Sequence, residues 1–225
     1  MKKMFAFLLA AVMCISLTAC GNDSEGKNDT ENTPIVGGWT NTESPEVTKE
    51  VKALLEKATA ELDGADYTPV AYLGTQVVAG TNHLLLCKVT PVVPDAVSTY
   101  ALVTIYEDLK GEAKITEVQN NDAEAGVLDA PGGWQDTESL EVTKESLEAL
   151  RLASQKLTGA TYSPVALLGT QVVAGTNYRM LCTVTPVTPN AEPKYEIVVI
   201  SVDVDMETGT LETYGFYTTE EEAGE

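Results

Sequence analysis

Histidine is nearly missing from this chain of 225 residues, in which His83 is the single example. A catalytic nucleophile and the base that activates it must lie within hydrogen-bonding distance of each other. The nearest cysteine, Cys87, is four residues further along a predicted strand, which places the two about 13 Å apart. The sequence shows no Walker-type glycine loop, metal-ligand cluster or Ser-His-Asp set. We therefore expect neither an enzyme nor a bound metal or cofactor.

Basic residues are also scarce, because 14 Lys and Arg stand against 34 Asp and Glu and give a formal net charge of −20 at pH 7. Nucleic acids and anionic lipid surfaces are polyanions, so a surface this acidic disfavours both as partners. The same charge favours solubility. We expect a protein that binds no nucleic acid and exists as a monomer.

Long apolar runs are missing except near the start, where residues 4–17 follow Lys2 and Lys3. This run is short for a membrane span and is typical of a secretory signal. The segment Leu17-Thr18-Ala19-Cys20 is similar to the bacterial lipobox. We expect the removal of residues 1–19, lipidation of Cys20, and an exported protein anchored to the bacterial membrane through that lipid only, facing outside the cytoplasm. An ordinary signal peptide followed by a chance cysteine is the alternative.

The four cysteines do not form a disulfide framework. Cys14 leaves with the signal peptide and Cys20 is assigned to the lipid. Cys87 and Cys182 are the remaining pair, one in each of two equivalent segments. We interpret both as buried strand residues, because a free cysteine behaves as a small apolar side chain. A disulfide between the two segments is the alternative.

An internal repeat organises the rest of the chain. Gly37-Gly38-Trp39 recurs 95 residues later as Gly132-Gly133-Trp134, and residues 73–82 (LGTQVVAGTN) recur unchanged as 168–177. A period this long indicates two whole domains rather than solenoid units. The expected divisions are a signal peptide at 1–19, an acidic tether at 20–34, a first repeat at 35–121, a linker at 122–129, a second repeat at 130–219 and an acidic tail at 220–225.

Each repeat reads as one helix followed by strands. An apolar helical stripe in the first repeat starts after a predicted N-cap at Ser44 and ends before Gly64. Strands follow, in which every second residue shares a face. The residues that alternate with the cysteine face include polar ones, such as Arg179, so we expect the cysteine face to point to the core. The predicted class is α+β, with one long helix packed across a four- to five-stranded antiparallel sheet in each repeat. The stripes comprise Val47, Val51, Leu54, Leu55, Ala58 and Leu62, and then Val142, Leu147, Leu150, Ala153 and Leu157.

The repeated Gln-Val-Val-Ala-Gly segments, 76–80 and 171–175, match the Q-x-V-x-G motif of the cystatin family. The Thr-Asn that follows each copy, with Tyr178 in the second, resembles the stefin branch. Glycine pairs upstream and a helix between them and the motif occur in the same order as in cystatins. The resemblance implies two tandem cystatin-like domains.

Cystatins inhibit papain-type cysteine proteases with a wedge of three parts, and the resemblance assigns each part to residues of this chain. The third part resembles the stefin Leu-Pro-Gly hairpin in the first repeat only, because the second repeat has an acidic segment at 203–209. The spacing of that segment does not fit a calcium-binding EF-hand. The implied protease-binding residues are Ile35, Val36, Gly37, Gly38, Gln76, Val77, Val78, Ala79, Gly80, Leu109 and Gly111, and then Gly132, Gly133, Gln171, Val172, Val173, Ala174 and Gly175.

The resemblance implies a reversible, competitive inhibitor of papain-type cysteine proteases, displayed on the bacterial surface. The second part is identical in the two repeats, and the first repeat alone keeps a partial third part, in which Leu109 and Gly111 match and the proline does not. We therefore expect the first repeat to be the stronger inhibitor. The alternative is a non-inhibitory binding or adhesion module of the cell envelope, which the poor match of the third part keeps open.

Overall fold

The computed structural model describes residues 38–124 and 132–218. The predictions for the signal peptide, the tether, the acidic tail, Cys20, Ile35, Val36 and Gly37 lie outside these residues. Within them, no helix has the length and apolar character needed to cross a bilayer. The first repeat contains β1 (Trp39–Asn41), α1 (Lys49–Thr59), β2 (Ala65–Val78), β3 (Gly80–Pro91), β4 (Thr99–Glu107) and β5 (Ala113–Glu124). The second contains β6 (Gln135–Asp136), α2 (Lys144–Ser154), β7 (Ala160–Val173), β8 (Gly175–Pro186), β9 (Lys194–Val202), β10 (Gly209–Gly215) and β11 (Tyr217–Thr218).

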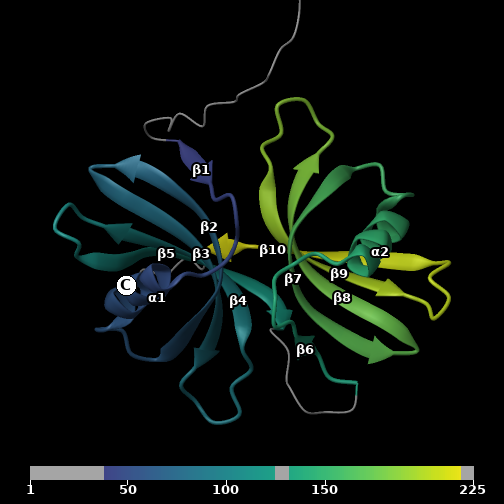
Figure 1. Cartoon of the computed structure of the whole chain (residues 1–225), viewed down its shortest axis with the longest axis horizontal. Helices are drawn as coiled ribbons and strands as arrows, with labels where there is room; N and C mark the ends of the chain where they lie inside the picture. Colours follow the sequence, from purple (N-terminus) through teal and green to yellow (C-terminus); the bar gives the residue numbers. More distant parts are fainter. Residues whose placement is uncertain (1–37, 125–131, 219–225) are drawn as a thin grey trace, which may run out of the picture. The chain divides into compact units, whose positions relative to one another are not determined.

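The strands form two antiparallel sheets (Figure 1). The first has the order β1-β2-β3-β4-β5-β11, and the second has the order β10-β9-β8-β7-β6. Strand β11 belongs to the second repeat by sequence but pairs with β5, where Tyr217 lies opposite Asn120. The side-chain amide of the buried Asn121 donates to the carbonyl oxygens of Tyr214 and Gly215 and holds this crossing in place.

The predicted fold class, two separate α+β domains, is wrong. Strands account for 53% and helices for 13% of the described structure, and the sheets include a curled half-barrel. Each helix is only 11 residues long, whereas the longest strands have 14. Strand β5 continues to Glu124, so the first residues of the expected linker are part of a sheet. Residues 34–225 form one compact unit that contains both repeats.

The helix α1 begins later than predicted, because Thr48 and not Ser44 is its N-cap. The Thr48 hydroxyl oxygen accepts from the amide of Val51, and Thr143 caps α2 in the same way. The segment before α1 stays extended because the carbonyl oxygen of Pro45 accepts from the amide of Tyr72 on β2 (2.9 Å). The helix also ends at Thr59, so the last member of the predicted stripe, Leu62, lies beyond it and is exposed. In the second repeat Leu147 and Leu157 are exposed as well.

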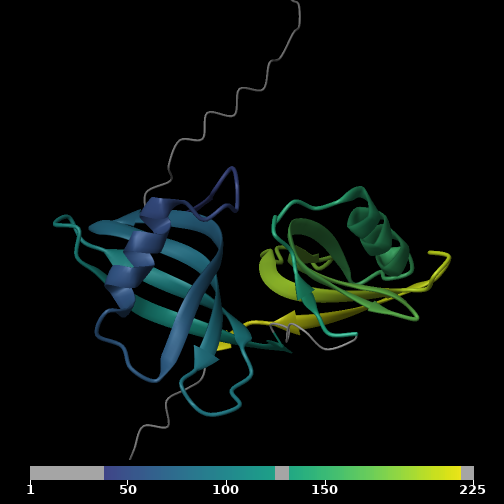
Figure 2. The same ribbon diagram turned by 60° about the horizontal axis from the view of Figure 1, so that its bottom comes forward.

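The cysteine face of β3 packs under α1, which crosses one face of the first sheet (Figure 2). Cys87 and Cys182 are both free and fully buried, which confirms their interpretation as core residues. Burial raises the pKa of each thiol to about 12. The first helix-facing cluster consists of Val51, Leu54, Leu55, Ala58, Leu85, Cys87, Ala101, Val103 and Ile105.

The other face of each sheet is also covered, because the two repeats share a further core. Equivalent positions of the repeats, 95 residues apart, enter it in pairs: Ala71 with Ala166, Leu73 with Leu168, Leu86 with Leu181, and Leu102 with Ile197. An ion pair between Lys88 and Asp136 joins the repeats at the edge of this region. Each sheet is thus buried against a helix on one face and against the other repeat on the second face, so strands contribute most of the core.

Candidate functional site

The Gln-Val-Val-Ala-Gly segments form the tips of two β-hairpins. Ala79 lies at the turn between β2 and β3, and Ala174 at the turn between β7 and β8. The valines just before each turn are exposed, and Val172 retains 70% of its accessible surface. Aliphatic side chains at a hairpin tip lose water contact only when a partner covers them, so these tips favour binding to an apolar surface.

The terminal glycine of each motif fits tightly against the neighbouring strand. Gly80 has φ +131° and Gly175 has φ +125°, which side chains rarely adopt. A Cβ at Gly80 would meet the carbonyl oxygen of Glu107, and one at Gly175 would meet that of Val202. The Tyr106 hydroxyl also donates to the carbonyl oxygen of Ala79 (2.6 Å). Each tip is thus fixed against the end of the strand that leads to the next hairpin.

The β4–β5 hairpin carries the third predicted part of the site. Leu109 is 90% exposed, and Gly111 has a positive φ, as a tight turn requires. The carboxylate of Asp108 accepts from the amides of Lys110 and Glu112, while the Lys57 ammonium donates to the Gly111 carbonyl oxygen (2.6 Å). The hairpin is therefore braced by its own carboxylate and by α1.

The acidic segment of the second repeat has a similar form, which the sequence interpretation missed. Val204, the equivalent of Leu109, is 78% exposed. Met206 takes the positive φ of Gly111. The Asp203 carboxylate accepts from the hydroxyl and amide of Thr208 and the amide of Glu207, and these bonds, led by that from the Thr208 hydroxyl, lower its pKa. The repeat offset of 95 residues aligns Val204 with Leu109, and this alignment was the signal in the sequence that could have predicted the similarity.

In the second repeat the glycine segment contacts the Gln-Val-Val-Ala-Gly hairpin. The side-chain amide of Gln171 donates to the Gly132 carbonyl oxygen (2.6 Å), and its oxygen accepts from Asn177 (2.7 Å). Val172 and Val173 share a hollow of about 340 Å³ with residues of the β9–β10 hairpin. The two parts predicted for this repeat, the glycine segment and the Gln-Val-Val-Ala-Gly tip, are thus in contact, and the β9–β10 hairpin lies beside the tip. The other residues that line the hollow are Gly175, Thr176, Tyr178, Val202, Asp203, Val204 and Met206.

In the first repeat the described residues bring together the two hairpins and the β1 strand. Trp39 lies opposite Gln76, directly after Gly38, so β1 leads the chain along the strand that ends at the hairpin tip. Asn82 donates to the side-chain oxygen of Gln76 (2.8 Å), as Asn177 does to Gln171. The same Gln-Asn brace therefore supports both tips.

The single histidine belongs to a polar group beside the first tip. The Tyr72 hydroxyl lies 2.8 Å from Nδ1 of His83, and a Glu107 carboxylate oxygen lies 3.4 Å from Nε2. Burial lowers the pKa of His83, and Glu107 opposes this effect only in part. The Cys87 thiol, with its pKa of about 12, stays protonated at neutral pH and is a poor nucleophile. The group is suited to holding strands β2, β3 and β4 together.

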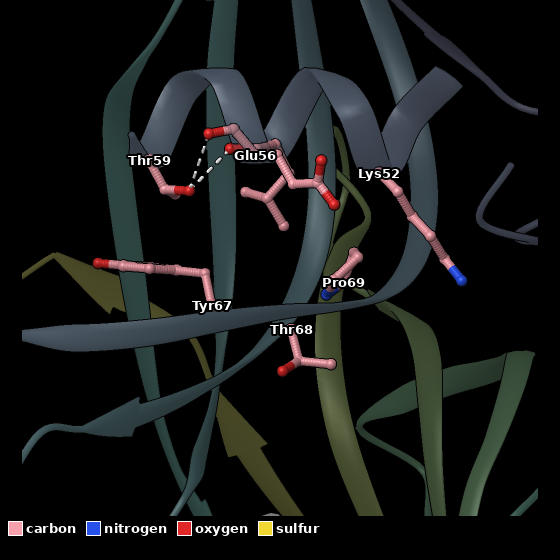
Figure 3. A pocket seen from close by; sticks show the side chains of 7 residues that line it. Lys52, Glu56, Thr59, Tyr67, Thr68 and Pro69 are labelled. Atoms are coloured by element: carbon pink, nitrogen blue, oxygen red, sulfur yellow. Dashed lines mark hydrogen bonds between the residues drawn. The ribbon is translucent and has the colours of Figure 1, made fainter. Parts of the chain in front are cut away.

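A groove of about 300 Å³ lies between α1 and β2 (Figure 3). The Thr59 hydroxyl group lines the groove but donates to the carbonyl oxygens of Leu55 and Glu56 in its own helix. Burial raises the pKa of Tyr67 on the opposite wall, so its hydroxyl stays protonated. Lys52 and Glu56 also line the groove, which is therefore as polar as it is apolar. Among residues 38–124 and 132–218, no three His, Cys, Asp or Glu side chains are placed to hold a metal ion.

The described site is thus a set of exposed hairpin tips with apolar ends, which is an arrangement suited to binding. When the chain is compared with known proteins, no family model matches it and no curated protein shows significant similarity.

Proposed function

We propose that this chain is a reversible, competitive inhibitor of papain-type cysteine proteases. The observation that carries the proposal is the pairing of two exposed hairpin tips in each repeat, with the Gln-Val-Val-Ala-Gly tip held against the strand that leads to the second. The class of target comes from the resemblance of this motif to cystatins. The anchoring of the inhibitor to the bacterial surface through Cys20 is part of the proposal.

The physical basis for inhibition is the covering of the tip valines by the walls of the protease cleft. Removing aliphatic surface from water yields about 25 cal/mol per Å². The tips are braced by Tyr106 and by the Gln-Asn pairs, so little conformational entropy is lost on binding. Leu109 and Val204 extend the contact surface in each repeat.

The direct test is a titration of papain with the chain lacking residues 1–19, with residual activity measured on a small substrate. Inhibition at or below micromolar concentration supports the proposal, and unchanged activity contradicts it. The stoichiometry separates the repeats, because two active tips titrate two proteases per chain and one active tip titrates one.

Matched variants locate the binding surface. Val78→Asp and Val173→Asp place a charge in the proposed contact and should weaken inhibition by each repeat at least tenfold, about 1.4 kcal/mol. Val92→Asp and Val93→Asp are the controls, because these valines are even more exposed than the tip valines but follow the other end of β3. Equal loss from tip and control variants would show that the tips are not the contact.

A second candidate function, a binding or adhesion module, has its own observation. Val92, Val93 and Val97 form an exposed aliphatic group after β3, away from the hairpin tips, and Val187 follows β8 in the second repeat. If papain is not inhibited, the same control variants become the test of this candidate, since they should then abolish attachment to the chain's partner surface.

A further inference from the structure

A buried arginine lies between the repeats. Arg179 on β8 is 1% exposed, and its guanidinium carbon lies 4.0 Å from the ring centroid of Trp134 and 5.6 Å from that of Tyr100. The guanidinium also donates to the Tyr100 hydroxyl (3.3 Å). An arginine of the second repeat is thus held between a tryptophan of its own repeat and a tyrosine of the first.

The equivalent place in the first repeat has the two aromatic residues but no arginine. Subtracting the repeat offset of 95 residues from Trp134 and Arg179 gives Trp39 and Leu84, and adding it to Tyr100 gives Tyr195. The backbone register agrees, because Leu84 lies opposite Gly74 and Arg179 lies opposite Gly169. Leucine is shorter than arginine and carries no charge.

A cleft of about 580 Å³ opens at this second place, and Trp39, Leu84 and Tyr195 all line it. Trp39 is 45% exposed there. The Tyr195 hydroxyl donates to the side-chain oxygen of Asn41 (3.4 Å), which keeps the ring beside β1. The space that Arg179 fills between one pair of rings is therefore open to solvent between the other pair.

The charges around the cleft favour a cation. Glu117 on β5, opposite Thr104, lines it. Lys194 and Glu196 on β9 also border the cleft, but their side chains alternate with that of Tyr195. The Glu196 carboxylate acts on Cys182 and Tyr162 at the other face of the sheet, so Glu117 is the carboxylate that faces the cleft. The chain as a whole carries a formal charge of −20, which attracts cations and repels phosphates. Neutral polar groups from Asn41, Thr104 and Gln119 also line it, together with apolar residues that include Leu102 and Phe216.

We propose that this cleft binds a guanidinium group from outside the chain, in the position that Arg179 occupies at the equivalent place. A guanidinium is planar, weakly hydrated and stacks on aromatic rings, and it pairs with carboxylates through two parallel hydrogen bonds. Trp39 and Tyr195 supply the rings, and Glu117 supplies a carboxylate. The group belongs either to a free small molecule or to an arginine side chain of a peptide. This inference does not depend on protease inhibition.

The test is calorimetric titration of the chain lacking residues 1–19 with three probes. N-acetyl-arginine methylamide represents the free guanidinium, an arginine-centred pentapeptide represents the side chain, and the citrulline analogue of the first probe is the uncharged control of the same shape. We expect saturable binding of the arginine probes and at least about fivefold weaker binding of citrulline. Equal affinity for the two charged probes indicates that a small molecule suffices, whereas a tighter peptide indicates a peptide ligand.

Three variants locate the binding to the cleft. Leu84→Arg supplies the chain's own guanidinium and should abolish binding, while Trp39→Ala and Glu117→Gln should each weaken it about fivefold. Thermal unfolding of each variant shows whether it is folded, and Glu117→Gln decides the outcome if the other two fail to fold. Citrulline binding as tightly as arginine, unchanged binding by the folded variants, or no saturable binding below about 10 mM (weaker than about −2.7 kcal/mol) would overturn the proposal. Papain inhibition by Leu84→Arg should be unchanged, which keeps this result separate from the proposed function.

Discussion

The two repeats have the same succession of helix and hairpins but differ in the side chains at equivalent positions. The first repeat has His83 paired with Glu107 beside its tip, where the second has Tyr178 and Val202. The second has Arg179 buried against the first, where the first has Leu84 beside an open cleft. The hairpins themselves are preserved. The hairpin tips are therefore common to both repeats, whereas the interface and the charged groups differ between them.

The largest effect is expected in the core that the repeats share. Leu86→Ala and Leu181→Ala remove fully buried side chains at equivalent positions, and each should lower the free energy of unfolding by about 2–5 kcal/mol. Because both leucines lie in one cluster, the chain should still unfold in one step. Urea unfolding followed by circular dichroism and by tryptophan fluorescence tests this, and two separate transitions, of which each variant shifts only one, would show that the repeats are independent.

A smaller effect is expected at the hairpin glycines. Gly80→Ala and Gly175→Ala force an unfavourable φ and a contact with a backbone oxygen, so each should cost about 1–3 kcal/mol of stability and weaken inhibition by its own repeat. Gly64→Ala is the control, because Gly64 has φ +99° but no neighbouring atom within 4 Å of a Cβ. It should reduce stability and leave papain inhibition unchanged. Inhibition that survives both tip variants contradicts the role of the tips.

The sequence pattern correctly predicted local features of the structure, but it failed for features that depend on contacts between distant segments. Period-two patterns identified the hairpins and the buried face of Cys87 and Cys182. The polar side chain of Arg179 correctly indicates that the cysteine face points to the core, but Arg179 itself is also buried, because the second face of β8 packs on the other repeat. Ser44 is a chemically suitable N-cap, but the hydrogen bond between Pro45 and Tyr72 keeps that segment extended. Such choices depend on contacts that are far apart in the chain.

The pairing of β11 with β5 could not be read from the sequence for a similar reason. Its two residues, Tyr217 and Thr218, are too few to show a strand period, and the repeat pattern predicts that they belong to the second sheet. The hydrogen bonds of Asn121, together with the one that the Tyr217 hydroxyl donates to Asp122 (2.7 Å), hold β11 against β5. The pairing of this second-repeat strand with the first sheet also explains why the predicted fold of two separate α+β domains is wrong.

A modest pH effect is expected at the acidic hairpin of the second repeat. Hydrogen bonds hold the pKa of Asp203 below its ordinary value of 3.8, so its contribution to stability is present above pH 3.8 and is lost as the pH falls through its lower native value. Asp203→Asn should remove that dependence. The check is an NMR titration of the carboxylate with melting temperatures between pH 5 and pH 2; a native pKa above 3.8 would contradict the prediction.

The smallest effect is expected from the variant His83→Tyr, which places in the first repeat the residue type found at the equivalent position, 178, of the second. Burial lowers the pKa of His83 below 6.5, so between that value and the lower native value the unfolded chain binds more protons than the folded chain. Stability should therefore fall slightly as the pH is lowered through this range, and His83→Tyr should remove that part of the dependence. Melting temperatures of both proteins at pH 7.5 and pH 5.5 provide the measurement. If acid stabilises the original chain relative to the variant, the attraction of Glu107 outweighs burial and the pKa is raised, which would make the histidine a strengthening contact of the first tip at low pH.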